Sequence, residues 1–211
     1  MSESPTVAVF DFDGTITRRD SLVPFVRRVA GPGRVAWATV RTGPALLAMA
    51  VGRADRDRTK AAFLARAIGG LDQAALERQA PAYAAGLVAR RTRPEIVARV
   101  RAHQDAGHEL VVISASPSVY VRCAAEELGI PTVLATELAV DDAGRVTGGF
   151  VGRNVRGQEK VRRLEEWIGA RDVVVWAYGD SPGDRELLDR ADVGVFVGRP
   201  HPVLPELPAH H

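Results

Sequence analysis

The sequence predicts an α/β fold, in which a parallel sheet carries helices on both faces and a helical cap is inserted after the first strand. Short apolar runs alternate with amphipathic helical stretches from about residue 92 to residue 197, which is typical of strands and crossover helices in a parallel sheet. The segment 17–91 departs from this alternation, because it has many helix signals and few strand signals. Since it directly follows the first apolar run, we expect it to form a separate cap domain.

The first strand is expected at 6–11, where an apolar run ends in two carboxylates, Asp11 and Asp13, followed by Gly14. A short apolar run that stops at a turn is typical of a buried strand. The carboxyl ends of such strands line the crevice where open α/β sheets bind ligands. Two acids this close repel each other and raise one pKa unless a cation lies between them. The pair therefore indicates a divalent metal or a phosphoryl reaction.

The segment 21–91 is expected to form three or four short helices, because glycines and prolines interrupt it near 31–33, 43–44 and 69–70. The segment Thr92–Glu95 resembles a capping box with a proline at the helix start, so a helix is expected from there to Gly107.

The remainder reads as strand–loop–helix units. We expect strands at 110–113, 131–134, 173–178 and 193–197, helices at 116–129, 159–168 and 182–191, and a hairpin at 136–150. The predicted domains are therefore a core of 1–16 and 92–198, a cap of 17–91, and a proline-rich tail of 199–211 that we expect to be extended.

Composition excludes several classes of protein. The net charge of the 211 residues is only +2 and the basic residues are scattered, so we expect no nucleic-acid partner. No secretory signal pattern and no uncharged apolar stretch long enough for a membrane span are present in the sequence. The single cysteine, Cys123, permits no internal disulfide and fits a reducing compartment, so a cytoplasmic location is expected.

Lysine usage carries additional information. Only two of the 28 basic residues are lysines, Lys60 and Lys160. Where any cation would serve, this chain uses arginine, so a lysine here indicates a place that needs a compact point charge.

Polar residues stand at the carboxyl ends of the predicted strands. Asp11 and Asp13 end the first strand, Ser114 ends the second, and Asp180 ends a later one, while Lys160 begins a helix before it. These ends gather at one edge of a parallel sheet. Three acids, a hydroxyl and an ammonium group form the set needed to hold a phosphate dianion together with Mg²⁺.

The order of these motifs resembles the haloacid dehalogenase-like hydrolase superfamily, in particular its subfamily IB with phosphoserine-phosphatase-like members. The family's four motifs match Asp11–Thr15 (Asp-x-Asp-Gly-Thr), the apolar run ending at Ser114, Lys160 early in a helix, and Gly179–Asp184 (Gly-Asp-x-x-x-Asp). The resemblance covers roughly residues 6 to 197 and implies a Rossmann-like three-layer core with a small helical cap.

The resemblance also implies residue roles. Asp11 is the expected nucleophile, and Asp13 is the expected general acid and then general base. Asp11, the backbone carbonyl of Asp13, and Asp180 would bind Mg²⁺. The remaining expected site residues are the phosphate-binding Ser114, Ala115 and Lys160 and the supporting Gly14, Thr15 and Asp184. Backbone N–H groups of the 12–14 turn and of Ser116 are expected to add phosphate donors.

Three departures from phosphoserine phosphatases leave the substrate open. Those enzymes carry Glu at the place of Asp20, where it binds the substrate amine, Ser-Gly-Gly at the place of 114–116, and Asn at the place of Gly183. Asp20 is therefore a candidate specificity residue. The expected substrate is a small phosphorylated alcohol, either phosphoserine-like or a phospholipid headgroup ester.

The sequence thus predicts a Mg²⁺-dependent phosphomonoesterase. The alternatives are a phosphotransferase and a phosphoryl-accepting regulatory domain, since receivers also place acids and a lysine at strand ends. Two features of the predicted cap can be interpreted either as ordinary structure or as a binding site. The apolar run 45–51 fits a cap-helix core better than an acyl-chain pocket, and the arginines at 53, 56 and 58 fit a solvated helix face better than an anion site.

Overall fold

A computed structural model describes residues 4–198 and 204–207 of the 211-residue chain. The predicted tail, 199–211, lies outside the described residues except for 204–207, which form neither helix nor strand. Within the described residues, no helix is both long enough and apolar enough to cross a membrane.

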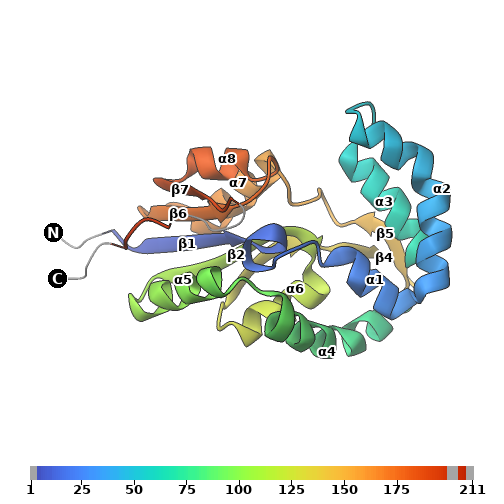
Figure 1. Ribbon diagram of the computed structural model, residues 1–211, viewed down its shortest axis with the longest axis horizontal. Coiled ribbons are helices and arrows are strands. Elements are labelled where there is room, and N and C mark those ends of the chain that lie inside the picture. Colours follow the sequence, from blue (N-terminus) through green and yellow to red (C-terminus); the bar gives the residue numbers. More distant parts are fainter. Residues whose placement is uncertain (1–3, 199–203, 208–211) are drawn as a thin grey trace.

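The core is a five-stranded sheet in which every pairing is parallel. Its strand order is β3-β2-β1-β6-β7, with β1 in the centre (Figure 1). The strands are β1 (Thr6–Asp11), β2 (Glu109–Pro117), β3 (Thr132–Thr136), β6 (Val174–Gly179) and β7 (Val193–Phe196). Because all five run in the same direction, their carboxyl ends meet at one edge, as the sequence predicts.

Helices cover both faces of this sheet. Ala8 and Phe10 of β1 pack on one side with α5 (Pro94–Asp105) and α6 (Ser118–Glu127). Val7 and Val9 pack on the other side with α7 (Gln158–Ile168) and α8 (Arg185–Arg190). The two helical layers lie above and below the sheet in Figure 1. The expected three-layer α/β architecture is therefore confirmed.

The segment between β1 and β2 folds into four helices. They are α1 (Leu22–Ala30), α2 (Pro32–Ala50), α3 (Arg56–Ala67) and α4 (Gln73–Arg91), and we call them the cap helices. The first three lie beyond the carboxyl edge of the sheet (Figure 1), whereas α4 packs along α6. The predicted boundaries of the cap and core domains stay a prediction.

The helix break predicted at 43–44 is wrong, because α2 continues through Gly43 and Pro44. Proline removes the hydrogen bond that its N–H would donate to the carbonyl of Val40. Val40 and Pro44 both face solvent, where water can satisfy that carbonyl, so the helix tolerates the proline. The breaks at Gly31 and Gly70 are real, and both residues have positive φ angles, 81° and 80°.

The predicted capping box at Thr92–Glu95 is also wrong. The Thr92 hydroxyl donates to the carbonyl of Val88 at 2.8 Å, at the end of α4. The N-cap position of α5 is Arg93, which makes no side-chain capping bond. The helix expected from residue 116 begins at Ser118, because Ser116 and Pro117 still belong to β2.

The predicted hairpin forms outside the main sheet. Its strands, β4 (Leu138–Val140) and β5 (Val146–Phe150), pair with each other, and β5 packs against α3. Gly148 makes this approach possible: it has a φ of +86°, and a Cβ there would lie 2.2 Å from the backbone of Ala65. The hairpin thus reaches from the core to the cap helices (Figure 1).

Candidate active site

The carboxyl edge of the sheet opens into a cavity of about 710 Å³. Core residues from the ends of β1, β2 and β6 line one half of it, and residues of α1, α2 and α3 line the other half. Of the ten residues predicted for the site, nine line this cavity; the exception is Thr15. Parallel strand direction brings these distant segments together.

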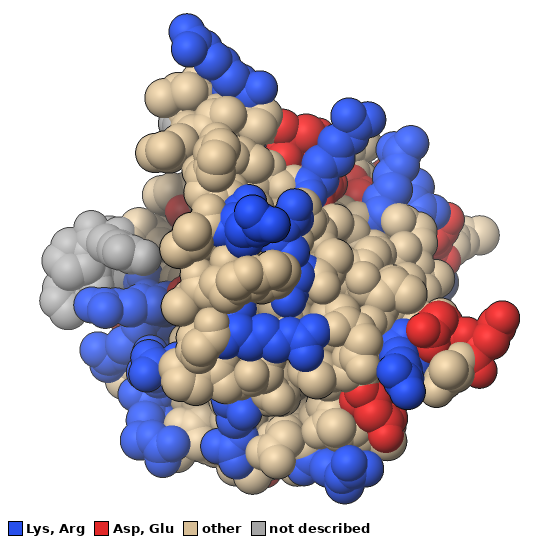
Figure 2. All heavy atoms as spheres, turned by 90° about the vertical axis from the view of Figure 1, so that its right-hand side faces the viewer, with Lys and Arg blue, Asp and Glu red and all other residues tan. Residues whose placement is uncertain are grey.

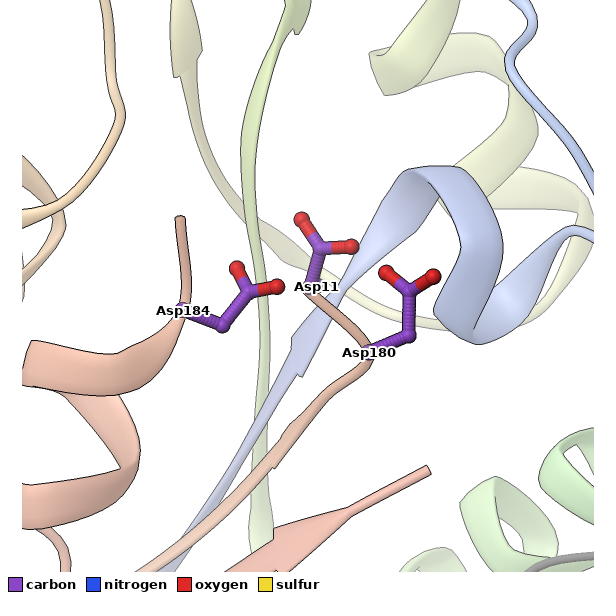
Figure 3. Close-up of side chains that lie close together, drawn as sticks. All are labelled: Asp11, Asp180 and Asp184. Carbon is purple, nitrogen blue, oxygen red and sulfur yellow. The ribbon is translucent and has the colours of Figure 1, made fainter. Parts of the chain in front are cut away.

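Three carboxylates gather at the base of the cavity. Asp11 ends β1, Asp180 follows β6, and Asp184 precedes α8 (Figure 3). Each offers an oxygen atom, and these atoms all lie within 4.8 Å of one another. The chain turns sharply beside them at Gly14, which has a φ of +87°. A Cβ there would lie 2.1 Å from Asp180 Oδ2, so only glycine lets this turn pass so close to the acid.

Lys160 neutralises part of this charge. Its Nζ donates to Asp11 Oδ1 at 2.5 Å and to Asp184 Oδ1 at 2.6 Å. The side chain is almost completely buried, which by itself lowers the pKa of a lysine. The two carboxylates outweigh burial, so the pKa of Lys160 is raised and the group is an ammonium ion. Lys160 stands in the first turn of α7, as its place in the motif predicts.

The two carboxylates bound to Lys160 differ in their pKa. Burial raises the pKa of Asp11 from 3.8 to about 7, helped by the charges of Asp184 and Asp13 and opposed by Lys160. Burial also raises the pKa of Asp184, but Lys160 and the Ser181 hydrogen bonds outweigh it, so the pKa is lowered. Ser181 donates to Asp184 Oδ2 through its backbone N–H at 3.0 Å and its hydroxyl at 2.7 Å.

Asp13 lies beside Asp11, but its carboxylate contacts other groups. The backbone N–H of Ser21 donates to Oδ1 at 2.8 Å, and the Ser116 hydroxyl donates to Oδ2. Burial and the nearby charge of Asp20 raise the pKa of Asp13 to about 6, although both serine hydrogen bonds lower it. Asp13 is thus held between the start of α1 and the end of β2, with a pKa at which it can exchange a proton near neutrality.

The other predicted residues take varied positions. Ser114 is buried, and its Oγ accepts a hydrogen bond from the Ser116 N–H at 3.0 Å. Phosphate donors were expected at this chain segment, and that expectation stays a prediction; the Ser114 hydroxyl can still donate its own hydrogen. Thr15 is fully buried, and its Oγ1 has no hydrogen-bond partner among the described residues. Asp20 lines the cavity and accepts from the Val23 N–H at 3.2 Å, which begins α1.

Lys60 lines the cavity although it does not lie at the end of a strand, so the pattern of strand ends does not predict it. It projects from α3, and its Nζ donates to Asn154 Oδ1 at 2.8 Å and to the carbonyl of Ala115. Burial lowers its pKa to about 8, against the attraction of Asp13, Asp57 and Asp20. The scarcity of lysine was a usable signal, because both lysines of the chain line this cavity. Nothing in the sequence marked Asn154, whose amide also donates to Asp57 Oδ1 at 2.7 Å.

Arg156 is another cavity residue that was not predicted. Its guanidinium occupies the space beside Gly183, where a Cβ would lie 2.8 Å from Nε. The glycine at position 183 therefore admits an arginine to this side of the cavity.

Apolar side chains line the half of the cavity made by the cap helices: Leu22 and Val23 of α1, Leu46 and Met49 of α2, and Phe63 of α3. The apolar run 45–51 was expected to form cap core. Leu46 and Met49 face the cavity instead, whereas Leu47 and Val51 are 72% and 66% exposed. Of the three nearby arginines, Arg56 lines the cavity and all three are exposed.

Comparison with known proteins accords with this geometry. A family model described as haloacid dehalogenase-like hydrolase matches residues 8–189 of the chain. The chain belongs to this family. It is 37% identical to protein CicA of Caulobacter vibrioides over 203 residues, which cover 95% of this chain and 90% of CicA. The superfamily membership expected from the motifs is therefore confirmed.

Two solved structures share the fold of this haloacid dehalogenase-like chain. A protein with unknown function from Bordetella pertussis Tohama I has a TM-score of 0.73 at 24% identity, covering 88% of this chain and 86% of its own. A phosphoserine phosphatase in a phospho-aspartyl intermediate analogue form has a TM-score of 0.63 at 19% identity, covering 90% and 84%. The likeness to phosphoserine phosphatases that the motifs indicate is confirmed at the level of the fold.

Proposed function

We propose that this chain is a cytoplasmic, Mg²⁺-dependent phosphomonoester hydrolase that acts through an aspartyl-phosphate intermediate on Asp11. The observation that carries the proposal is the pairing of two adjacent acids with different surroundings. Asp11 is bound to Lys160 within the acidic cluster, whereas Asp13 is bound to two serines and has a pKa near 6. Two carboxyl groups with such different partners can divide nucleophilic and acid–base work between them, provided that a cation bound beside Asp11 lowers its pKa of about 7 below that of Asp13.

The donor set fits magnesium. The clustered side chains of Asp11, Asp180 and Asp184 offer only carboxylate oxygens, and Mg²⁺ prefers hard oxygen ligands. Asp11, Asp180 and the backbone carbonyl of Asp13 would hold the ion, with Asp184 adjoining it. When bound, the ion would cancel negative charge on the phosphoryl group and on the acids around it.

In the first step, an Asp11 carboxylate oxygen would attack phosphorus while the bond from phosphorus to the leaving alcohol breaks. Asp13 would give its proton to the departing alkoxide. Lys160 and the Ser114 hydroxyl would hold phosphoryl oxygens. The positive charge of Lys160 and the hydrogen bonds from both groups would offset the repulsion between the Asp11 carboxylate and the phosphate. In the second step, Asp13 would take a proton from water, which attacks phosphorus and releases inorganic phosphate from Asp11.

The cap half of the cavity would receive the leaving alcohol. It combines the acid Asp20 and the cation Lys60 with the apolar wall of α1, α2 and α3. This surface suits a small phosphorylated alcohol with polar and apolar parts, so phosphoserine-like compounds and phospholipid headgroup esters are both substrates to test. Hydrogen bonds from Lys60 to Ala115 and Asn154 join the cap helices to the core beside Ser114, and this connection would help to exclude water from the reacting groups once a substrate is bound.

A panel of phosphomonoesters, including phosphoserine and lysophosphatidate, tests this function with Mg²⁺ present and with EDTA. Phosphate release should require Mg²⁺ and should be lost in Asp11→Asn. Asp105→Asn is the matched control, because Asp105 is an exposed acid at the end of α5. Unimpaired turnover in Asp11→Asn, or turnover unaffected by EDTA, would contradict the proposal.

The same samples separate the rival functions. A regulatory phosphoryl acceptor would give a long-lived phosphoprotein from acetyl phosphate without continued phosphate release. A phosphotransferase would convert an added acceptor alcohol into a new phosphate ester. We do not expect the regulatory acceptor, because Asp13 lies beside Asp11 and its raised pKa suits proton transfer during turnover. Analysis of the products decides between hydrolysis and transfer to an acceptor alcohol.

A further inference from the structure

The outer face of α2 carries an exposed apolar stripe. Trp37, Val40 and Leu47 are 52%, 75% and 72% exposed, and Val51, which follows the helix, is 66% exposed. Pro44 lies between them and also faces solvent. These five residues recur at intervals of three and four positions, which places them on one side of a helix. We call them the α2 stripe.

The stripe is held outward by the packing of the same helix. Val35, Ala38 and Thr42 on its other side are buried, and Leu46 and Met49 line the cavity. Only eight large hydrophobic residues are exposed in the described part of the chain, and four of them belong to this stripe. Exposed apolar residues gathered in this way mark an interaction surface, whereas single ones are ordinary.

The surroundings of the stripe are basic. Residues 17–91 contain 14 Lys and Arg but only 5 Asp and Glu, a net charge of +9 in a chain whose total is +2. Arg41 on α2 and Arg53 just after it are exposed. Figure 2 faces the side of the molecule on which α2 lies, and basic side chains spread across this face while acidic ones lie toward its edges.

We propose that the α2 stripe docks this protein onto an anionic membrane surface, with α2 lying along the interface rather than crossing it. Trp37, Val40 and Leu47 would enter the boundary between headgroups and acyl chains, and the arginines would approach lipid phosphates. A helix with an apolar face and basic flanks is the type that binds such a surface. The cytoplasmic leaflet supplies the negative charge that a basic face of this kind attracts.

Charge complementarity selects this occupant over a second copy of the chain. Two stripes brought together would place two basic faces against each other, with Arg41 and Arg53 of both copies close together, which opposes association. An anionic bilayer satisfies both the apolar and the basic groups. The proposal goes beyond the hydrolase function and does not depend on it, because no residue of the stripe lines the cavity.

Vesicle flotation tests the proposal with the full-length protein. Vesicles of phosphatidylcholine alone are compared with vesicles that also contain phosphatidylglycerol, at low and at high salt. We expect binding to the anionic vesicles only, weakened by salt because screening reduces the attraction of the arginines. Trp37→Glu and Leu47→Glu should each lower vesicle affinity at least about tenfold, the ratio that corresponds to about 1.4 kcal/mol.

Matched variants make the result specific. Phe196→Glu changes an exposed apolar residue on β7 of the core sheet, and it should bind vesicles as the unchanged protein does. Arg41→Glu should weaken binding more than Arg101→Glu, which changes an exposed arginine on α5. Because these positions are exposed, all variants should keep the thermal transition of the unchanged protein, which separates lost binding from lost folding.

Several outcomes would overturn the proposal. Equal binding to neutral and anionic vesicles, no binding to either, or an equal effect of Trp37→Glu and Phe196→Glu would each do so. So would a dimer, measured by light scattering, that Trp37→Glu converts to a monomer, since the stripe would then bind a second copy. Asp11→Asn should still bind vesicles, so a failure of the hydrolase function and a failure of docking are distinguishable.

Discussion

At the scale of single residues, Lys160 sets the charge balance of the site. It is a buried ammonium ion that donates to two carboxylates, Asp11 and Asp184. Asp11 ends β1 near the start of the chain, and Asp184 precedes α8 near its end. An ammonium ion is compact and can serve both acids and a phosphoryl group, whereas a guanidinium is a planar fork that needs more room. The chain uses arginine almost everywhere else, so the lysine here reflects the geometry of the site.

We therefore expect Lys160→Arg to be nearly as inactive as Lys160→Met. Each should lower phosphomonoesterase turnover by about 10²- to 10³-fold, the range for removing one preorganised stabilising group. The measurement is steady-state phosphate release with saturating Mg²⁺. The control is Lys60→Met, which should mainly raise KM because Lys60 lies in the cap half of the cavity, where the leaving alcohol would bind. A Lys160→Arg variant with full turnover would contradict the assigned geometry.

A second prediction concerns the proton that Asp13 would deliver. Asp13→Asn should slow hydrolysis of an alkyl phosphate by about 10²- to 10⁴-fold, the usual contribution of general acid catalysis. An aryl phosphate with an acidic leaving group needs little protonation, so its first step should be slowed much less. The comparison is made by rapid-quench measurement of alcohol release from both substrates. Equal losses for the two substrates would exclude Asp13 as the acid.

Residue-level prediction succeeded where a residue type is tied to a strand end. Asp11, Asp180 and Lys160 could be placed because an apolar run or a helix start fixes their position along the chain. Asn154 and Arg156 could not be found in this way, because they lie in the loop between β5 and α7. Lys60 was marked by the scarcity of lysine, but its place on a cap helix gave no sign that it reaches Ala115.

At the scale of elements, close contacts between helices and strands explain several local features. The strands of the sheet could be predicted because each is a short apolar run that ends in a turn. The continuation of α2 through Pro44 could not be predicted, because it depends on which side of the helix faces solvent. The position of the hairpin against α3 could not be read from its own sequence either, since it rests on one glycine and a distant helix.

The contact between the hairpin and α3 yields a stability prediction. Gly148→Ala should lower the free energy of unfolding by about 2 to 4 kcal/mol, because it adds both backbone strain and an overlap with the Ala65 backbone. Gly144→Ala is the matched control, because Gly144 has a similar φ of +74° but no atom within 4 Å of the added Cβ. Gly144→Ala should lower the free energy of unfolding by only about 1 kcal/mol. Urea unfolding measures both, and equal losses would contradict the close approach.

The contact of α5 with β6 contributes a pH dependence. His103 is fully buried, and its ring shares hydrogen bonds with Tyr178 Oη at 2.8 Å and His108 Nδ1 at 2.7 Å. Burial, followed by the charges of His108 and Arg99, lowers the pKa of His103 from 6.5 to about 3. The unfolded chain therefore binds a proton below about pH 6.5 that the folded protein does not, and stability falls as pH decreases through this range.

We expect His103→Gln to weaken this dependence. Between about pH 6 and about pH 4, the unchanged protein should lose up to about 1.4 kcal/mol per pH unit relative to the variant. Asp11 and Asp13 have raised pKa values and contribute the opposite slope, but they do so in both proteins and cancel in the comparison. Urea unfolding at several pH values gives the difference, and parallel curves would show that His103 does not titrate as stated.

At the scale of the whole molecule, the cavity exists because two parts of the chain meet. The sheet supplies acids and Lys160 at one edge, while α1, α2 and α3 supply Lys60 and an apolar wall. The charge is divided in the same way: residues 17–91 carry a net +9 and the remainder of the chain carries −7. The basic part meets the acidic edge of the sheet at the cavity, and its outer face carries the α2 stripe.

The central claim is that Asp11 becomes covalently phosphorylated during turnover. Mixing the protein with a phosphomonoester and Mg²⁺, quenching in acid and mapping the peptides by mass spectrometry tests this claim directly. We expect one added phosphoryl group on the peptide that contains Asp11, sensitive to hydroxylamine, and lost with EDTA or in Asp11→Asn. Continued phosphate release with no such adduct at any quench time, or an adduct on another residue, would contradict it.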